Sequence, residues 1–222
     1  MEFIYADALK KKFAVYGHFY NLEINGTAFS CRSMLEITSK SEGLQLQATP
    51  NAVVVMMNPG SCRPVEPDYT PRLHTASEMT SPTWEKILVP ARPDNAQYQI
   101  MRLMLLKEWK HVRILNLSDL RNGNSRDFSL DFATANSLDP SSPHSITHTG
   151  RLQELKRSCL GVPLVIAAWG TNEVLRQMAE SFLSKIRVRG ISLNRPWYRY
   201  PSPYRKDQKI EWLKNAFSEL DS

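Results

Sequence analysis

Two asparagines stand where buried strands are expected to end, and their side-chain amides are the first candidates for chemistry. Asn58 follows the apolar run 52–57 and precedes Pro59 and Gly60, and Asn116 stands near the end of a second such run. Runs that are apolar on both faces indicate interior parallel strands, and ligands of open α/β sheets bind beyond the carboxyl ends of such strands. An amide held there can position a water molecule or grip the edge of a ring, since it offers one acceptor and two donors. The alternatives are an ordinary Pro-Gly turn after Asn58 and a satisfied turn at Asn116.

A second candidate region is the segment 194–206, which interleaves four cations with four aromatic residues. Cations neutralise phosphates, and apolar or guanidinium groups can wedge a base step open. Small residues such as Ser202 let backbone N–H groups approach a phosphate closely. The segment therefore predicts contact with nucleic acid; the alternative is a solvated basic loop with its aromatics packed beneath it. The residues expected to bind DNA are Arg195, Arg199, Ser202, Pro203, Tyr204, Arg205 and Lys206.

Three stretches, taken together and in chain order, resemble the uracil-DNA glycosylase superfamily. Residues 57–60, Met-Asn-Pro-Gly, resemble the motif of the thymine and mismatch-specific branch, in which the asparagine positions the attacking water. Residues 114–117 resemble the strand whose terminal asparagine reads the pyrimidine edge, and residues 200–203, Tyr-Pro-Ser-Pro, resemble the loop that enters the minor groove. Residues 165–170 take the place of the family's apolar strand that ends in glycine. The chain is also similar to an uncharacterised bacterial and phage family with an Asn-Pro-Ser-Thr motif, and together the matches span most of residues 29–205.

The resemblance assigns roles to further residues, and the sequence departs from the family at two of them. Tyr200 stands where the family has a histidine that supports charge on the departing base, and Asn58 stands where the classical uracil branch has a water-activating acid. Asp68, or Glu66 near it, is a candidate for the base that activates water. The expected catalytic residues are therefore Asn58, Tyr200 and Asp68, and the expected substrate-binding residues are Asn116, Tyr69, Pro59 and Gly60, with Tyr69 stacking on the flipped base.

These assignments lead us to expect a monofunctional DNA glycosylase. It would flip out a damaged or modified pyrimidine and excise it by water attack on the N-glycosidic bond, without metal or cofactor. The resemblance also implies a possible place in phage defence, where the substrate would be a modified cytosine in phage DNA. Two alternatives stay open: a non-catalytic nucleic-acid-binding module of the same fold, and a hydrolase of free nucleosides or nucleotides.

The composition sets the class of protein. The chain has 222 residues, of which 42% are hydrophobic and 23% charged, as is typical of soluble globular proteins. Its net charge of +6 suits a polyanionic partner such as DNA. No apolar run approaches the roughly 20 residues needed to cross a bilayer. The three cysteines are scattered and the five histidines show no metal-binding spacing, so we expect a cytoplasmic monomer with reduced thiols and no metal.

A sheet must position the candidate residues, and the sequence predicts its strands. We expect a three-layer α/β/α sandwich with a central, mainly parallel four-stranded sheet, because strands alternate with helical patterns. An N-terminal β-hairpin should turn at Asn25-Gly26. Residues 1–222 then form one domain, in which residues 1–50 are a helix-and-hairpin extension. The four central strands are expected near residues 52–57, 112–117, 163–169 and 186–193.

The segments between the strands are expected to be helices and two long loops. Apolar spacing predicts helices near residues 83–88, 96–109 and 149–160. The proline-rich segment 58–82 and the segment 121–148, rich in Ser, Asn, Asp and Pro, predict ordered loops.

Overall fold

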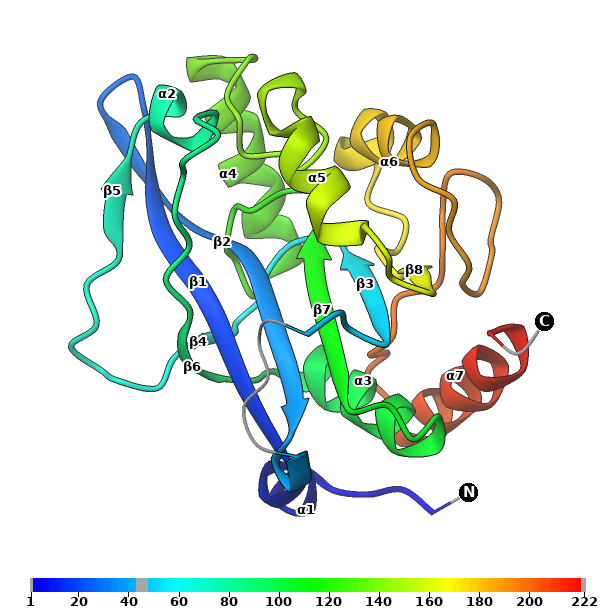
Figure 1. Ribbon diagram of the computed structural model, residues 1–222. Coiled ribbons are helices and arrows are strands. Elements are labelled where there is room, and N and C mark those ends of the chain that lie inside the picture. Colours follow the sequence, from blue (N-terminus) through cyan, green and yellow to red (C-terminus); the bar gives the residue numbers. More distant parts are fainter. Residues whose placement is uncertain (1, 43–47, 221–222) are drawn as a thin grey trace.

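The computed structural model describes residues 2–42 and 48–220. Within these ranges the chain is a mixed α/β protein with seven α-helices and one eight-stranded sheet (Figure 1). The strands lie in the order β4-β6-β1-β2-β7-β3-β8, and β5 pairs with β1. The strands are β1 Phe13–Ile24, β2 Thr27–Ser39, β3 Ala52–Met56, β4 Arg63–Pro64, β5 Arg72–His74, β6 Val89–Arg92, β7 His111–Asn116 and β8 Val165–Ala167. The α-helices are α1 Ala6–Lys12, α2 Ala76–Met79, α3 Asn95–Leu106, α4 Ser125–Leu138, α5 Leu152–Cys159, α6 Arg176–Leu183 and α7 Lys206–Glu219, and short 3-10 turns lie at Lys40–Glu42, Thr149–Arg151 and Glu173–Leu175.

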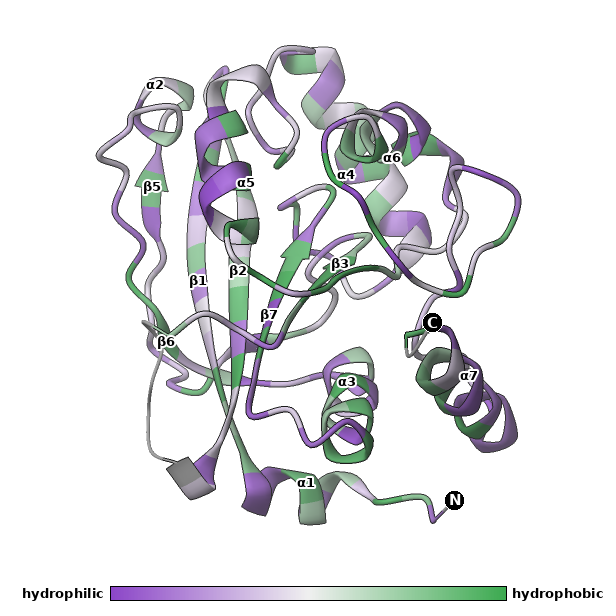
Figure 2. Ribbon diagram, turned by 45° about the vertical axis from the view of Figure 1, so that its right-hand side comes forward, coloured by the Kyte–Doolittle hydropathy of each residue, from purple (hydrophilic) through white to green (hydrophobic). Residues whose placement is uncertain are grey.

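One end of the sheet consists of the parallel strands β7, β3 and β8, with β3 between the other two and β8 at the edge. All five residues of β3 are buried. Ala52, Val54 and Met56 belong to the hydrophobic cluster on one face of the sheet, and Val53 and Val55 belong to the cluster on the other. An apolar run without alternation is what burial on both faces requires, so the predicted interior strand is confirmed. Figure 2 shows β3 in the green of hydrophobic residues.

The sheet is mixed, whereas four mainly parallel strands were expected. Residues 186–193, predicted to be the fourth strand, form isolated bridges only: Arg189 pairs with Ile166 in parallel, and Ser192 pairs with Tyr198 in antiparallel orientation. The hairpin turns at Asn25 and Gly26 as predicted, both at positive φ, but β2 then pairs antiparallel with β7. The hairpin therefore lies inside the sheet and is not an added extension, because the second half of β2 is buried on both faces.

Each face of the sheet carries its own hydrophobic cluster. One cluster combines core residues of the strands with apolar residues from α1, α3 and α7. The other combines them with apolar residues from α2, α4, α5 and α6. In Figure 1 the first set of helices gathers at the lower side of the molecule and the second at the upper side. No helix within the described ranges is long and apolar enough to cross a membrane.

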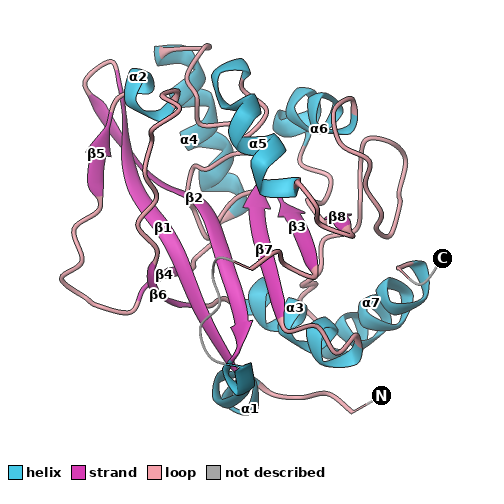
Figure 3. Cartoon of the chain, in the orientation of Figure 1, coloured by secondary structure: helices cyan, strands magenta, loops and turns pink. Residues whose placement is uncertain are grey.

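Several elements lie in segments that were predicted differently. The predicted loop 121–148 contains the helix α4, which begins after Asn124, whose side chain accepts hydrogen bonds from two backbone N–H groups. Phe128, Phe132 and Ala135 give α4 one buried stripe at helical spacing, and its many polar residues face outward. The predicted loop 58–82 contains β4, β5 and α2, and the predicted helix 83–88 has no helical turn (Figure 3).

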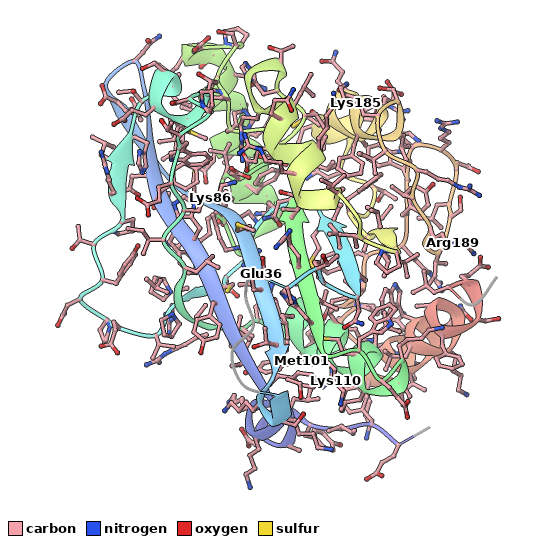
Figure 4. All side chains as sticks on the ribbon, in the orientation of Figure 1. Glu36, Lys86, Met101, Lys110, Lys185 and Arg189 are labelled. Carbon is pink, nitrogen blue, oxygen red and sulfur yellow. The ribbon has the colours of Figure 1, made fainter. Side chains whose placement is uncertain are left out.

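An ion pair fixes the hairpin to the parallel strands of the sheet. Glu36 of β2, labelled in Figure 4, has a side chain that is 1% exposed. His111 Nε2 lies 2.7 Å from Glu36 Oε2, and Arg113 Nε donates to Glu36 Oε1 at 2.6 Å. Because both partners stand on β7, this cluster locks the register of β2 against the strand that leads to Asn116.

Candidate active site

A cleft of about 1310 Å³ opens at the carboxyl ends of the parallel strands. Its lining comes from the segments that follow β3, β7 and β8, from the first turn of α3 and from residues 200–209. This is the place where ligands of open α/β sheets bind, and it is large enough for a nucleotide.

Asn58 lies at the base of this cleft and is 8% exposed. The backbone around it is held by strand-like hydrogen bonds from Leu117 N to Met56 O and from Ser118 N to Met57 O. The Asn58 amide Nδ2 donates to Asn122 O at 2.7 Å. Since a carbonyl oxygen can only accept, the amide must turn its nitrogen toward this partner. This orientation leaves Oδ1, the acceptor of the amide, outside the hydrogen bond to Asn122.

Asp94 is a carboxylate in the cleft that the sequence analysis did not single out. It caps α3: Oδ1 accepts from Ala96 N and Gln97 N, and Gln97 Oε1 accepts from Asp94 N. The capping bonds use Oδ1, so Oδ2 is turned toward Gly60, where a β-carbon would collide with it. Gly60 has φ +66 and lines the cleft beside Asn58. The cap therefore places a carboxylate oxygen against the Asn58 loop. A capping-box pattern, Asp94 with Gln97, is its signal in the sequence.

Tyr200 enters the cleft from the loop that follows β8. Gly170 N donates to Tyr198 O at 2.9 Å, and this bridge carries the chain past the end of β8. A β-carbon at Gly170 would lie 3.6 Å from Tyr200 Cβ. Tyr200 is 40% exposed as a whole, yet burial of its phenol raises the pKa of the hydroxyl, and the Asp94 charge raises it further. The ring thus reaches from Gly170 inward toward Asp94 with its hydroxyl protonated.

The cationic rim is the name we give to Ser202, Pro203, Tyr204, Arg205 and Lys206, all of which line the cleft. Tyr204 is 98% exposed. Arg205 forms a bidentate pair with Asp207 at 2.6 and 3.0 Å, and Lys206 Nζ donates to the Tyr5 hydroxyl at 2.8 Å. The side chains are thus presented at the mouth of the cleft.

Two of the residues expected to bind DNA lie outside the cleft lining. Arg199 donates to Glu211 of α7 at 2.9 Å, so its charge is used to hold the loop against that helix. Arg195 is exposed on the excursion between residues 190 and 198 and is not part of the cleft lining. Of the predicted basic loop 194–206, only residues of the second half therefore line the cleft.

Asn116 is near the cleft but does not line it. It is fully buried opposite Met56, and its Nδ2 donates to Arg32 O at 3.5 Å. Its Oδ1 has no hydrogen-bond partner among the described residues. Of the Pro59-Gly60 pair, Gly60 lines the cleft, whereas Pro59 is buried and does not.

Tyr69 and Asp68 lie away from Asn58. Tyr69 lines a separate hollow of about 540 Å³, and its hydroxyl donates to Phe19 O at 3.4 Å. Asp68 is exposed and lines neither hollow. The physical reason is β4, which pairs with β6 and leads the chain after Cys62 away from the cleft.

A buried ionic network supports the segment that follows β7. Asp119 Oδ2 accepts from the Tyr20 hydroxyl and from Arg151 Nη1, each at 2.7 Å. Arg151 also binds Glu154 through two nitrogens, and Lys86 binds Glu154. Burial raises the pKa of Asp119 to about 6, against the Arg151 charge, which lowers it. The network anchors the chain just before Asn122, whose carbonyl orients Asn58.

Comparisons with known proteins do not assign this chain to a family. Searches of protein-family models, curated proteins and solved structures found no match to this chain. In the part of the chain that the structure describes, no group of three or more His, Cys, Asp or Glu side chains is arranged to hold a metal ion.

Proposed function

We propose that this protein is a DNA glycosylase, which hydrolyses the N-glycosidic bond of a damaged or modified pyrimidine that is flipped out of the strand. One observation carries the proposal: Asn58 and Asp94, whose Oδ2 lies against Gly60, line the same cleft as the cationic rim. The resemblance of residues 57–60, 114–117 and 200–203 to the uracil-DNA glycosylase superfamily supports it.

The reaction assigned to this site needs a positioned water and a proton acceptor. Asn58 Oδ1 accepts a hydrogen bond from the water, and Asp94 Oδ2 accepts its proton as the oxygen bonds to the sugar carbon C1′. The C1′–N1 bond breaks and its electron pair leaves with the base. Asp94 takes the role expected of Asp68, because Asp94 is the carboxylate in the cleft.

The cationic rim is assigned to the phosphates that flank the flipped nucleotide. Tyr204, at the mouth of the cleft, offers a ring that can stack on a neighbouring base. The proposal includes the finer expectations of a three-layer α/β/α arrangement and of a cytoplasmic monomer acting on DNA without metal or cofactor.

The experiment uses oligonucleotides that carry uracil, a thymine mismatch or a modified cytosine, in single and double strands. Alkali-labile abasic sites are the readout. We expect cleavage of at least one substrate by the wild type, and its loss in Asn58→Ala and Asp94→Asn. Lys156→Ala is the control, since Lys156 is exposed on α5 and lies outside the cleft. No cleavage of any substrate by folded protein overturns the proposal, and salt-sensitive binding without cleavage would indicate a binding module instead.

A further inference from the structure

Three arginines gather around the hollow that Tyr69 lines. This hollow, of about 540 Å³, has Arg63, Arg92 and Arg121 in its lining, and we call it the arginine hollow. Arg63 and Arg92 are exposed, and Arg121 is half-buried. Among the described residues, Glu66 is the one acid that lines it, so three positive charges and one negative charge leave a net charge of +2.

The charges of the three arginines are not neutralised by acids. Within residues 2–42 and 48–220, none of the three forms an ion pair with a carboxylate. Arg92 Nη2 donates to Val65 O and Arg121 Nη1 donates to Cys62 O, each at 3.3 Å. These acceptors are neutral backbone carbonyls, so the hydrogen bonds orient two guanidinium groups and leave their charges uncompensated.

The pairing of two strands brings like charges together. Arg63 of β4 and Arg92 of β6 are direct partners in an antiparallel pair, and like charges directly opposite each other destabilise a sheet. Arg121 lies with its guanidinium 5.7 Å from the centre of the Phe19 ring. Burial lowers the pKa of Arg121, and the nearby Arg63 charge lowers it further. The fold therefore holds three positive charges close together, and an anion bound between them would offset their repulsion.

The arginine hollow adjoins the cleft of the candidate active site. Each arginine stands within two positions of a residue that lines the cleft: Arg63 follows Ser61, Arg92 precedes Asp94, and Arg121 precedes Asn122. Two residues of extended chain span about 7 Å at most. The loops also touch, since a β-carbon at Gly123 would lie 3.0 Å from Ser61 Cβ. A strand that leaves the cleft on this side therefore meets the arginine hollow next.

We propose that the arginine hollow binds phosphates of the same nucleic-acid strand that places a nucleotide in the cleft. This inference rests on the proposed function and adds a second stretch of substrate contact, separate from the cationic rim. Guanidinium groups pair with phosphate oxygens through two N–H groups. One free phosphate would fill only a small part of a hollow of about 540 Å³, whereas a strand that continues from the cleft brings one negative charge with every nucleotide.

The salt dependence of DNA binding tests the proposal without any need for catalysis. The probe is fluorescently labelled 20-nucleotide DNA, as a single strand and as a duplex, and anisotropy gives its affinity at several salt concentrations. Arg63→Gln, Arg92→Gln and Arg121→Gln should each weaken binding and reduce the slope of log affinity against log salt by about one. The double variant Arg63→Gln, Arg92→Gln should reduce it by about two. An unchanged slope in the double variant, or failure of the wild type to bind either probe, overturns the proposal.

Two matched variants separate a local effect from an effect of total charge. Arg187→Gln removes one charge from an exposed arginine that lines neither the cleft nor the arginine hollow, and it should keep the wild-type slope. Glu66→Gln removes the acid of the hollow, so it should tighten DNA binding. If Arg187→Gln lowers the slope as much as Arg63→Gln does, the effect belongs to net charge and the proposed site is wrong.

Thermal unfolding separates binding from a structural role. The double variant Arg63→Gln, Arg92→Gln removes a cross-strand pair of like charges, so its Tm should equal or exceed that of the wild type. Weaker DNA binding by this variant then cannot come from unfolding. A drop in Tm of several degrees together with a wild-type slope would assign these arginines to the fold and overturn the proposal.

Inorganic phosphate is the second probe, measured by calorimetry. Loss of phosphate binding in the double variant, with DNA affinity and slope unchanged, would make the hollow a site for a small anion and overturn the proposal of a strand. The outcome for excision is independent of these results. Excision of a base with wild-type slopes in the arginine variants would overturn this inference and leave the proposed glycosylase standing. Reduced slopes without excision of any base would overturn the glycosylase and leave the strand-binding hollow standing.

Discussion

A β-carbon at Gly60 would collide with Asp94 Oδ2, so any other residue at position 60 must displace this carboxylate. Gly60 also has φ +66, which other residues adopt at a cost. Gly60→Ala should therefore push Asp94 out of place, lower activity by at least about 100-fold and destabilise the fold by about 1–3 kcal/mol. Gly26→Ala is the matched control, because Gly26 has φ +82 but nothing within 4 Å of its β-carbon; it should cost stability and leave turnover unchanged. Urea unfolding and single-turnover kinetics measure the two effects.

The two oxygens of Asp94 have separable roles. Asparagine caps a helix as well as aspartate does, so Asp94→Asn should keep the α3 cap and change stability by less than about 0.5 kcal/mol. It lacks a proton-accepting carboxylate, so activity should fall by about 10²–10⁴-fold. Asp94→Ala should lose the same activity and also about 1 kcal/mol of stability, because its cap is gone. Equal activity in Asp94→Asn and the wild type would remove Asp94 from the reaction.

Asp207 neutralises Arg205 at the mouth of the cleft. Arg205→Ala and Lys206→Ala should each weaken DNA binding and reduce the slope of log affinity against log salt by about one. Asp207→Asn should have the opposite effect, because it frees Arg205 for a phosphate. Fluorescence anisotropy at several salt concentrations measures the slopes, with Lys156→Ala as the control. A slope that does not change in any rim variant argues against phosphate contacts there.

The acid sensitivity of the fold should come from two buried histidines. Burial lowers the pKa of His18 to about 3 and of His144 to about 4. The ordinary pKa of a histidine is 6.5. As the pH falls below 6.5, these two histidines take up protons in the unfolded chain but not in the folded chain. Stability is thus complete above pH 6.5 and is lost as the pH falls toward 4. Between pH 7 and 6 we expect a loss of about 1 kcal/mol from the two groups together.

Urea unfolding at pH 7 and pH 6 measures this loss. The range stops at pH 6 because Asp119, whose pKa burial raises to about 6, acts in the opposite sense below it. The double variant His18→Gln, His144→Gln should be less sensitive to pH over this range. An unchanged pH dependence in that variant would show that other groups carry the effect.

Local patterns in the sequence predicted the parts of this fold that local interactions determine. The run Ala52–Met56 is apolar on both faces and forms the interior strand β3, and Asn25-Gly26 forms the turn between β1 and β2. The position of Asn58 at the cleft follows from the end of that strand. Helix α4 was not predicted because its polar residues outnumber its buried apolar residues. Only the helical spacing of those buried residues indicates a helix.

The rest of the site depends on contacts between distant segments. Asp94 reaches the cleft because the first turn of α3 packs against the Asn58 loop, 34 positions earlier in the chain, and no short-range pattern encodes that approach. Tyr69 follows Asn58 closely in sequence, but the pairing of β4 with β6 carries it to another hollow.

The bridge at Arg189 also bears on how the molecule behaves at high concentration. Arg189 N donates to Val165 O at 2.9 Å, and Ala167 N donates to Arg189 O at 2.8 Å. These are the outward-facing groups of β8 that a strand from another copy would need for pairing. The bridge occupies them and leaves a cation at the border of the sheet, which opposes aggregation by strand addition.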